Sequence, residues 1–212
     1  MHDLADVTIR SISVSEMDNN VYLITGKATG AQVLIDAADD APAIHRLIAE
    51  GAADAEVPSQ LALVVTTHSH WDHVRALKDV VRATGARTAA GVEDVGDIAV
   101  PTDVPLNHGD VGEFDGFELE AIGLRGHTPG SVALVYRDPD GPVHLFTGDS
   151  LFPGGVGNTG GDPQRFESLY SDVVERIFNR FDDDTIVHPG HGKPTTLGAE
   201  RPSLAEWRSR GW

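Results

Sequence analysis

The segment TTHSHWDHV, residues 66–74, places three histidines and one aspartate within six positions. It follows the apolar run LALVV, which has the length and composition of a buried strand. Side chains two positions apart point to the same side of an extended chain, so His68 and His70 can face one site. Asp72 and His73 come where the chain turns into a helix, which can bring them beside the first pair. Imidazole and carboxylate groups together are suited to zinc, iron or manganese.

These four side chains outnumber the ligands of one catalytic zinc ion, which takes about three protein ligands and keeps one position open. The segment therefore indicates two ions, with further ligands from distant parts of the chain. Three candidates are His127 in RGHTPGS, Asp149 in FTGDSLF and His191 in HPGHG. Each lies in a glycine-containing loop after an expected strand, where a scaffold tends to hold functional residues. We expect the strand ends to bring them to one edge of the fold.

The other histidines outside these motifs are expected to be ordinary surface residues, because none sits among convergent polar partners in the sequence. They are His2, His45, His108 and His144.

Composition restricts the function further. The 212-residue chain has 16 Lys and Arg against 33 Asp and Glu, a formal charge of −17, which disfavours nucleic acid and anionic membranes as partners. It has no cysteine, so any metal ligands must be His, Asp or Glu. Neither a signal peptide nor a membrane span is recognisable, so the expectation is a cytoplasmic protein with one domain over residues 1–212.

Periodicity predicts strands and helices in two similar halves. The first half has a strand at 7–14, a hairpin at 20–36, a helix at 41–51 capped by Asp40, a strand at 61–67 buried on both faces, and a helix at 74–84. The second half has a hairpin at 111–124, strands at 131–137 and 142–148, a helix at 163–180, a short strand at 185–190, and a last helix at 197–209 interrupted by Pro202. This order suits two sheets packed face to face with helices outside.

The motif THSHWDH at 67–73, with the later GHTPGS, GDSLF and PGHG, resembles the metallo-β-lactamase superfamily over almost the whole chain. The resemblance implies an α/β fold, namely an αββα four-layer sandwich of two mixed β-sheets with outer helices. It implies two divalent metal ions, zinc before iron or manganese. His68, His70 and His127 would bind the first ion; Asp72, His73 and His191 would bind the second; Asp149 would bridge both. His188 would be structural rather than a ligand.

Such a pair of ions, about 3.5–4 Å apart, can ionise a water molecule near neutral pH, and the resulting hydroxide can attack a carbonyl carbon. Asp72 would orient this nucleophile or carry its proton. GHTPGS and GDSLF are most similar to the glyoxalase II group (hydroxyacylglutathione hydrolases), which implies hydrolysis of a thioester of a small thiol. Only about twenty residues follow His191, and Asn158-Thr159 stands where relatives usually have an arginine. The thiol is therefore expected to be less charged than glutathione, with mycothiol as one candidate.

Other members of the superfamily fit the sequence less well. True β-lactamases often have cysteine at a ligand position, di-iron flavoproteins have glutamate in place of His70, and RNA-processing members carry extra domains. A persulfide dioxygenase with one iron, a lactonase and a non-catalytic metal-binding module remain as alternatives. Gly154, Gly155 and Gly157 are expected to form a mobile or closely approached loop at the mouth of the site.

Overall fold

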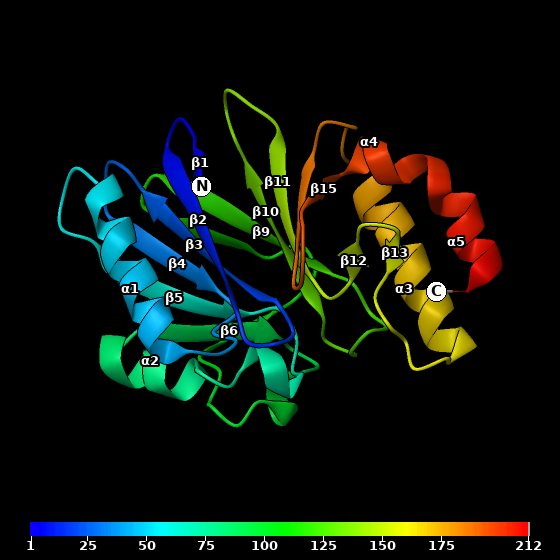
Figure 1. Cartoon of the computed structure of the whole chain (residues 1–212), viewed down its shortest axis with the longest axis horizontal. Coiled ribbons are helices and arrows are strands. Elements are labelled where there is room, and N and C mark those ends of the chain that lie inside the picture. The colour runs from blue at the N-terminus through cyan, green and yellow to red at the C-terminus, as the bar shows by residue number, and fades with distance from the viewer. Residues whose placement is uncertain (212) are drawn as a thin grey trace.

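The computed structural model describes residues 1–211 and shows four layers, helix, sheet, sheet and helix (Figure 1). The first sheet has seven strands in the order of the sequence. They are β1 (His2–Asp3), β2 (Val7–Val14), β3 (Asn19–Gly26), β4 (Ala31–Ile35), β5 (Gln60–Thr66), β6 (Arg87–Gly91) and β7 (Val104–Leu106). The first four strands pair antiparallel, and β4 to β7 pair parallel, so this sheet is mixed.

The second sheet is also mixed and has six strands in the order β15-β14-β11-β10-β9-β8. They are β8 (Val111–Phe114), β9 (Phe117–Gly123), β10 (Val132–Arg137), β11 (Val143–Gly148), β14 (Ile186–Pro189) and β15 (Thr195–Thr196). A separate pair, β12 (Leu151–Phe152) and β13 (Gly155–Val156), lies in the loop after β11. The predicted arrangement of two mixed sheets is therefore confirmed.

Helices α1 (Ala41–Gly51) and α2 (Leu77–Thr84) cover the outer face of the first sheet, and α3 (Pro163–Val173), α4 (Leu197–Glu200) and α5 (Leu204–Arg210) cover the second (Figure 1). Asp40 caps α1 by accepting a hydrogen bond from the Ala43 backbone N–H, as predicted. Asp162 caps α3 in the same way, with Pro163 at its first position. None of the helices in the described part of the chain has the length and apolar character needed to span a bilayer.

Strand direction brings the carboxyl ends of several strands to one edge. Strands β4, β5 and β6 are parallel neighbours, so their carboxyl ends lie side by side. In the second sheet, β9 and β11 both run antiparallel to β10, and β14 runs parallel to β11, so these three strands also share one direction. Hydrogen bonds from Asn20 N to Gly190 O (2.8 Å) and from Val132 N to Thr67 O (2.8 Å) join the two sheets at this edge.

Three apolar cores hold the layers together, one between each sheet and its helices and one between the sheets. The inter-sheet core includes Tyr22, Ile24, Val33, Leu134 and Phe146. Phe146 is fully buried at its centre, with its ring centroid 5.2 Å from that of Tyr22. The position of one sheet on the other therefore depends on aromatic packing at this level.

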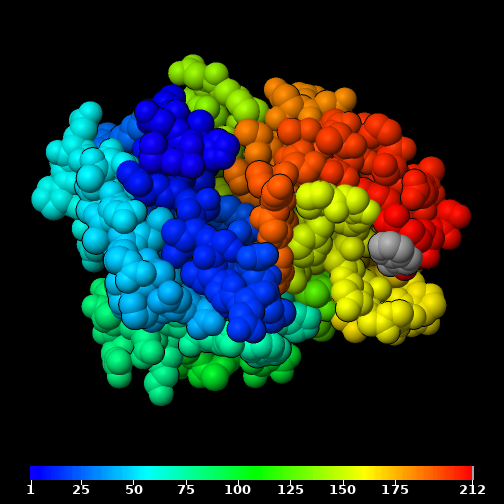
Figure 2. Space-filling view, viewed as in Figure 1, coloured from blue at the N-terminus to red at the C-terminus, as the bar shows by residue number. Residues whose placement is uncertain are grey.

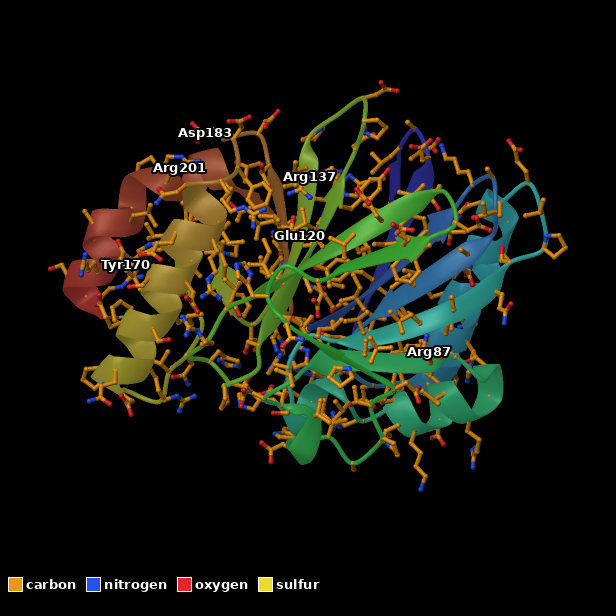
Figure 3. All side chains as sticks on the ribbon, turned by 180° about the vertical axis from the view of Figure 1, so that it is seen from behind. Arg87, Glu120, Arg137, Tyr170, Asp183 and Arg201 are labelled. Carbon is orange, nitrogen blue, oxygen red and sulfur yellow. The ribbon has the colours of Figure 1, made fainter. Side chains whose placement is uncertain are left out.

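Ion pairs lie within the second sheet and between this sheet and the helical layer. Figure 3 shows Arg137 beside Glu120 and Arg201 beside Asp183. On β9, Glu120 Oε2 lies 2.8 Å from Arg137 Nη2, and Glu120 Oε1 lies 2.9 Å from Arg180 Nη2. Arg201 also donates to the carbonyl oxygens of Phe178 and Phe181. These contacts secure the end of the long helical segment against the sheet.

Several predicted elements differ in detail. The helix expected at 74–84 begins at Leu77, because Trp71–His73 form a 3₁₀ turn. The helix expected at 163–180 continues from α3 into a π-helical turn, Val174–Phe178, and the last helix is broken by a 3₁₀ turn at Arg201–Ser203, where Pro202 lies. Short 3₁₀ turns also occur at Ala52–Asp54 and Val95–Asp97.

Three expectations about burial were wrong. The strand at 61–67 is not buried on both faces throughout, since Ala62 is exposed and Leu63 is half-buried. His144, expected at the surface, is 0% exposed, because β11 is a central strand of the second sheet. His2 is half-buried rather than exposed. The strands β6 and β7 were not predicted, because RTAAG and VPL carry little periodic signal.

Replacing Phe146 with alanine should lower the free energy of unfolding by about 3–5 kcal/mol, the usual cost of leaving a cavity in place of a buried aromatic ring. Urea unfolding measures this loss. Val111→Ala is the control, because Val111 is 54% exposed and should change stability by less than about 0.5 kcal/mol. Equal unfolding midpoints for the two variants would show that Phe146 does not hold the sheets together.

Candidate metal centre

The structure brings all seven predicted ligand residues together at the edge where the strands end. Three overlapping groups have ligand atoms within 4.8 Å of one another. The groups are His68, His70 and His127; His68, His73 and Asp149; and Asp72, His73 and His191. The predicted residues thus form one continuous cluster that extends across the junction of the two sheets.

Asp149 occupies the middle of this cluster. One of its carboxylate oxygens lies 3.4 Å from His73 Nε2, and the other lies 3.4 Å from His191 Nε2 and 3.6 Å from His127 Nε2. Two donors bound to one ion at about 2.1 Å lie about 3.0–3.4 Å apart. The spacing around Asp149 is close to that value, and it allows one carboxylate to serve two ions.

Several of these atoms are buried without a hydrogen-bond partner. His68 Nε2, His127 Nε2 and Asp149 Oδ1 have none among residues 1–211. Buried polar atoms are almost always paired, because an unpaired one costs about 1–3 kcal/mol. All three residues belong to the groups of ligand atoms that lie within 4.8 Å of one another, so the residues present fit a divalent metal site.

Asp36, which follows β4, supports the centre from behind. It is 2% exposed, and its Oδ2 lies 2.9 Å from His73 Nδ1 and accepts a hydrogen bond of 2.8 Å from Thr67 Oγ1. Its Oδ1 accepts a hydrogen bond from the Thr67 backbone N–H at 2.7 Å. Asp36 therefore fixes the ring of His73 and the start of the histidine segment at once.

The other ligand side chains are oriented in the same manner. His127 Nδ1 lies 2.8 Å from the carbonyl oxygen of Asn158, and His191 Nδ1 lies 2.7 Å from that of Met17. When Nδ1 of a neutral imidazole donates a hydrogen bond to a carbonyl, Nε2 carries no proton, and its electron pair is free to bind a metal ion. Asn19 donates to Asp72 Oδ2 at 2.9 Å.

Asp94, which follows β6, ties two of the ligand loops together. This fully buried carboxylate accepts hydrogen bonds from the backbone N–H of Ser69 (2.8 Å), from Thr128 Oγ1 (2.7 Å) and from the backbone N–H of Gly130 (2.6 Å). Ser69 lies between His68 and His70, and Thr128 follows His127. Asp94 therefore sets the distance between these loops.

The charges in the cluster oppose one another. Burial lowers the pKa of His73, but the carboxylates of Asp36 and Asp149 outweigh burial and raise it to about 10. The hydrogen bond to Asp149 raises the pKa of His191, whereas burial and the neighbouring His73 lower that of His68 well below its ordinary value. Contacts with His191 and His73 outweigh burial and hold the pKa of Asp149 far below its usual range. A cation would therefore displace a proton from His73 when it binds.

Close backbone approach explains the glycine of the HPGHG motif. A side-chain carbon at Gly190 would overlap Asp149 Oδ1 and lie 2.9 Å from His73 Cε1. Of the glycines expected at the mouth, Gly157 is the closely approached one, since a side chain there would overlap the carbonyl oxygen of Asp149. Only glycine avoids these overlaps at the two positions.

A cavity of about 550 Å³ opens beside the cluster. It is lined by Ser69, His70, Trp71, Asp97, His127, Thr128, Pro129 and Arg165. Trp71 is 60% exposed at the rim, and the Arg75 guanidinium lies 4.7 Å from the centre of its indole ring. The size and mixed lining suit a small organic molecule.

A match to a family model shows which family the chain belongs to. The model of the metallo-beta-lactamase superfamily matches residues 14–191, which include all seven clustered residues. The chain belongs to the metallo-β-lactamase superfamily. Within this superfamily it is similar to proteins named hydroxyacylglutathione hydrolase.

Two of these relatives differ in how much of their length is matched. The hydroxyacylglutathione hydrolase GloC of Haemophilus influenzae is 26% identical, over 93% of this chain and 96% of that protein. The hydroxyacylglutathione hydrolase of a Polaromonas species is 35% identical, over 80% of this chain but only 60% of that enzyme.

Two solved structures are similar over most of the chain. TTHA1623, solved in a di-iron-bound form, has a TM-score of 0.71 and 29% identity, covering 91% of this chain and 96% of that one. ETHE1 from Myxococcus xanthus has a TM-score of 0.79 and 26% identity, covering 95% of this chain and 85% of that one.

The sequence did not predict the roles of Asp36 and Asp94, the two carboxylates that support the cluster. Asp36 ends the apolar run VLID, where it was taken as the end of a strand, and Asp94 follows a strand that was not predicted. The signal available was the repeated pattern of an acidic residue just after a buried strand.

Asp36→Asn should weaken zinc binding by about 10–100-fold, because it removes the charge that orients His73 without changing the size of the side chain. Competition with a chromophoric chelator measures the affinity. Asp39→Asn, three residues away and paired with Arg75 at the rim, should bind zinc as the parent protein does. Equal affinity in both variants would remove Asp36 from the centre.

Proposed function

We propose that the protein is a binuclear metal-dependent hydrolase that cleaves a thioester of a small thiol. The observation that carries this proposal is the position of Asp149, whose two oxygens lie within 3.6 Å of His73, His191 and His127. A carboxylate placed between two groups of imidazoles is suited to join a pair of divalent ions.

The proposed ligands divide into two sets around Asp149. His68, His70 and His127 would hold one ion, and Asp72, His73 and His191 would hold the other. The di-iron-bound form of the similar protein TTHA1623 supports two ions over one. Imidazole and carboxylate donors suit zinc first, and iron or manganese as alternatives.

When bound, two such ions supply Lewis acidity, which polarises a carbonyl group and lowers the pKa of water toward neutrality. Asp72 would accept a proton from the attacking water. It is 6% exposed, its Oδ2 lies 3.4 Å from His191 Nε2, and Asn19 orients it through a hydrogen bond of 2.9 Å. A carboxylate fixed in this way can act as a general base or carry the proton away.

The cavity supports an acyl thiol as substrate. Trp71 and Pro129 offer apolar surface near His70 and His127, where an acyl chain can lie. A thiolate leaves readily, since the pKa of its thiol is about 8.5, so a thioester needs little help from a general acid. The names of the similar proteins in Haemophilus and Polaromonas support a thioester of this class.

Two of the cations near the mouth are already engaged. Arg165 donates from Nε and Nη2 to the carbonyl oxygens of Gly126 and His127. Arg125 is paired with Asp172 at 2.7 Å. Recognition of a carrier with several carboxylates would need free cations at this mouth. We therefore expect a less charged thiol than glutathione, for which mycothiol is a model.

Asp149→Ala should reduce both metal content and turnover, the latter by about 10²-fold or more, because it removes the group shared by the two ligand sets. Elemental analysis and a thioesterase assay on the same preparation measure the two quantities. Asp182→Ala, an exposed aspartate remote from the cluster, is the matched control. Full turnover by a metal-free Asp149→Ala protein would contradict the proposal.

A panel of substrates tests the reaction itself. Protein loaded with zinc, iron or manganese is assayed against acyl thioesters of mycothiol and of glutathione, a lactone and a glutathione persulfide, with oxygen uptake recorded. We expect thioester hydrolysis with two metals per chain and a higher kcat/KM for the less charged carrier. Oxygen uptake with one iron per chain would instead establish a persulfide dioxygenase, and hydrolysis of the lactone alone would establish a lactonase.

A further inference from the structure

A second cluster of imidazoles lies outside the candidate metal centre. His2 on β1, His144 on β11 and His188 on β14 have ligand atoms within 4.8 Å of one another. His144 Nδ1 lies 2.9 Å from His188 Nε2. The ring of His2 stands edge-on to both, with centroid distances of 4.9 and 5.3 Å. We name these three residues the histidine triad.

The histidine triad joins parts of the chain that are far apart in sequence. β1 belongs to the first sheet, whereas β11 and β14 belong to the second. Figure 2 shows the N-terminal segment, in dark blue, lying against the segment around residues 185–195, in orange. A cavity of about 230 Å³, lined among others by His2, Tyr22 and His188, opens here to the surface. An ion from solvent can therefore reach the triad.

All three imidazoles are held in the neutral form that binds metals. Burial lowers the pKa of His144 to about 4 and that of His188 to about 3, and burial also lowers the pKa of His2. The rings are also fixed in place, since His188 packs between Phe146 and Tyr22 with centroid distances of 4.8 and 5.4 Å. Three neutral, preoriented nitrogen donors favour a divalent ion of the zinc class.

Hydrogen bonding alone leaves the triad incompletely satisfied. The contact between His144 Nδ1 and His188 Nε2 needs one donor and one acceptor. The other ring nitrogen of His144, Nε2, is buried without a partner among residues 1–211, and it cannot bind the same ion as Nδ1. The contact also gives no reason for a third imidazole to stand beside the pair. Nitrogens bound to one zinc ion are about 3.3 Å apart, so the observed 2.9 Å requires only a small shift to admit an ion.

We propose that His2, His144 and His188 form a further metal site that binds one divalent ion of the zinc class. The proposal does not depend on the reaction at the main centre. Its consequence is mechanical, because the ion would join β1 to β11 and β14, and thus one sheet to the other. The loop that carries His191 begins just after His188, and its Pro189 carbonyl accepts a hydrogen bond from Tyr22 Oη at 2.7 Å.

Zinc stoichiometry tests the proposal. Protein stripped with a chelator is equilibrated with a small excess of zinc, passed through a desalting column and analysed for metal. We expect His2→Gln and His144→Gln each to retain one zinc ion fewer per chain than the parent protein. His108→Gln, which replaces an exposed histidine, is the control and should retain the parent value.

The same substitutions in the Asp149→Ala background separate the triad from the main centre. There we expect the retained zinc to fall by a further one ion per chain on adding His2→Gln. His2 is half-buried on a two-residue edge strand, so His2→Gln should fold even if His144→Gln does not. Unchanged zinc content on adding His2→Gln, in both backgrounds, would overturn the triad site and leave the proposed hydrolase standing. If the main centre bound no zinc, adding His2→Gln would still lower the zinc content by one ion per chain.

Discussion

The metal centre depends on strand direction. Three parallel strands of one sheet and three strands of common direction in the other deliver their carboxyl ends to the same edge, so residues from Asp36 to His191 meet there. Strand ends are good positions for ligands, because regular backbone hydrogen bonds stop and polar side chains become the partners of what lies beyond. Reversing any one of these strands would move its loop to the opposite edge.

The carboxylates behind the histidines are as important as the histidines. Asp36 and Asp94 are buried, and each bonds to two or more groups on the loops that carry the proposed ligands. Burial of an aspartate is costly unless both carboxylate oxygens accept hydrogen bonds. The loops must therefore lie where their N–H and O–H groups can donate to Asp36 and Asp94. The buried nitrogen and oxygen atoms without a hydrogen-bond partner belong to the residues of the cluster that these loops carry.

The sequence predicted the layers and the seven clustered residues because both leave dense local signals, namely apolar runs followed by polar, glycine-containing loops. It could not predict β6 and β7, whose short segments have no clear period, or Asp94, whose meaning depends on β6. His144 was misjudged for a related reason. An isolated histidine in a strand looks like a surface residue, and only the position of that strand inside the sheet shows that it is buried. Long-range order of strands is the information that the local pattern lacks.

The location of the centre at the junction of the two sheets also affects how the molecule comes apart. His68, His70, Asp72 and His73 follow a strand of one sheet, whereas His127, Asp149 and His191 follow strands of the other. Any cation held by both sets favours the closed, folded state by mass action, so sheet separation and ion release become one coupled event. Removing the metal with a chelator would then lower the stability of the folded protein, and resistance to proteases would rise with the concentration of free metal ions in solution.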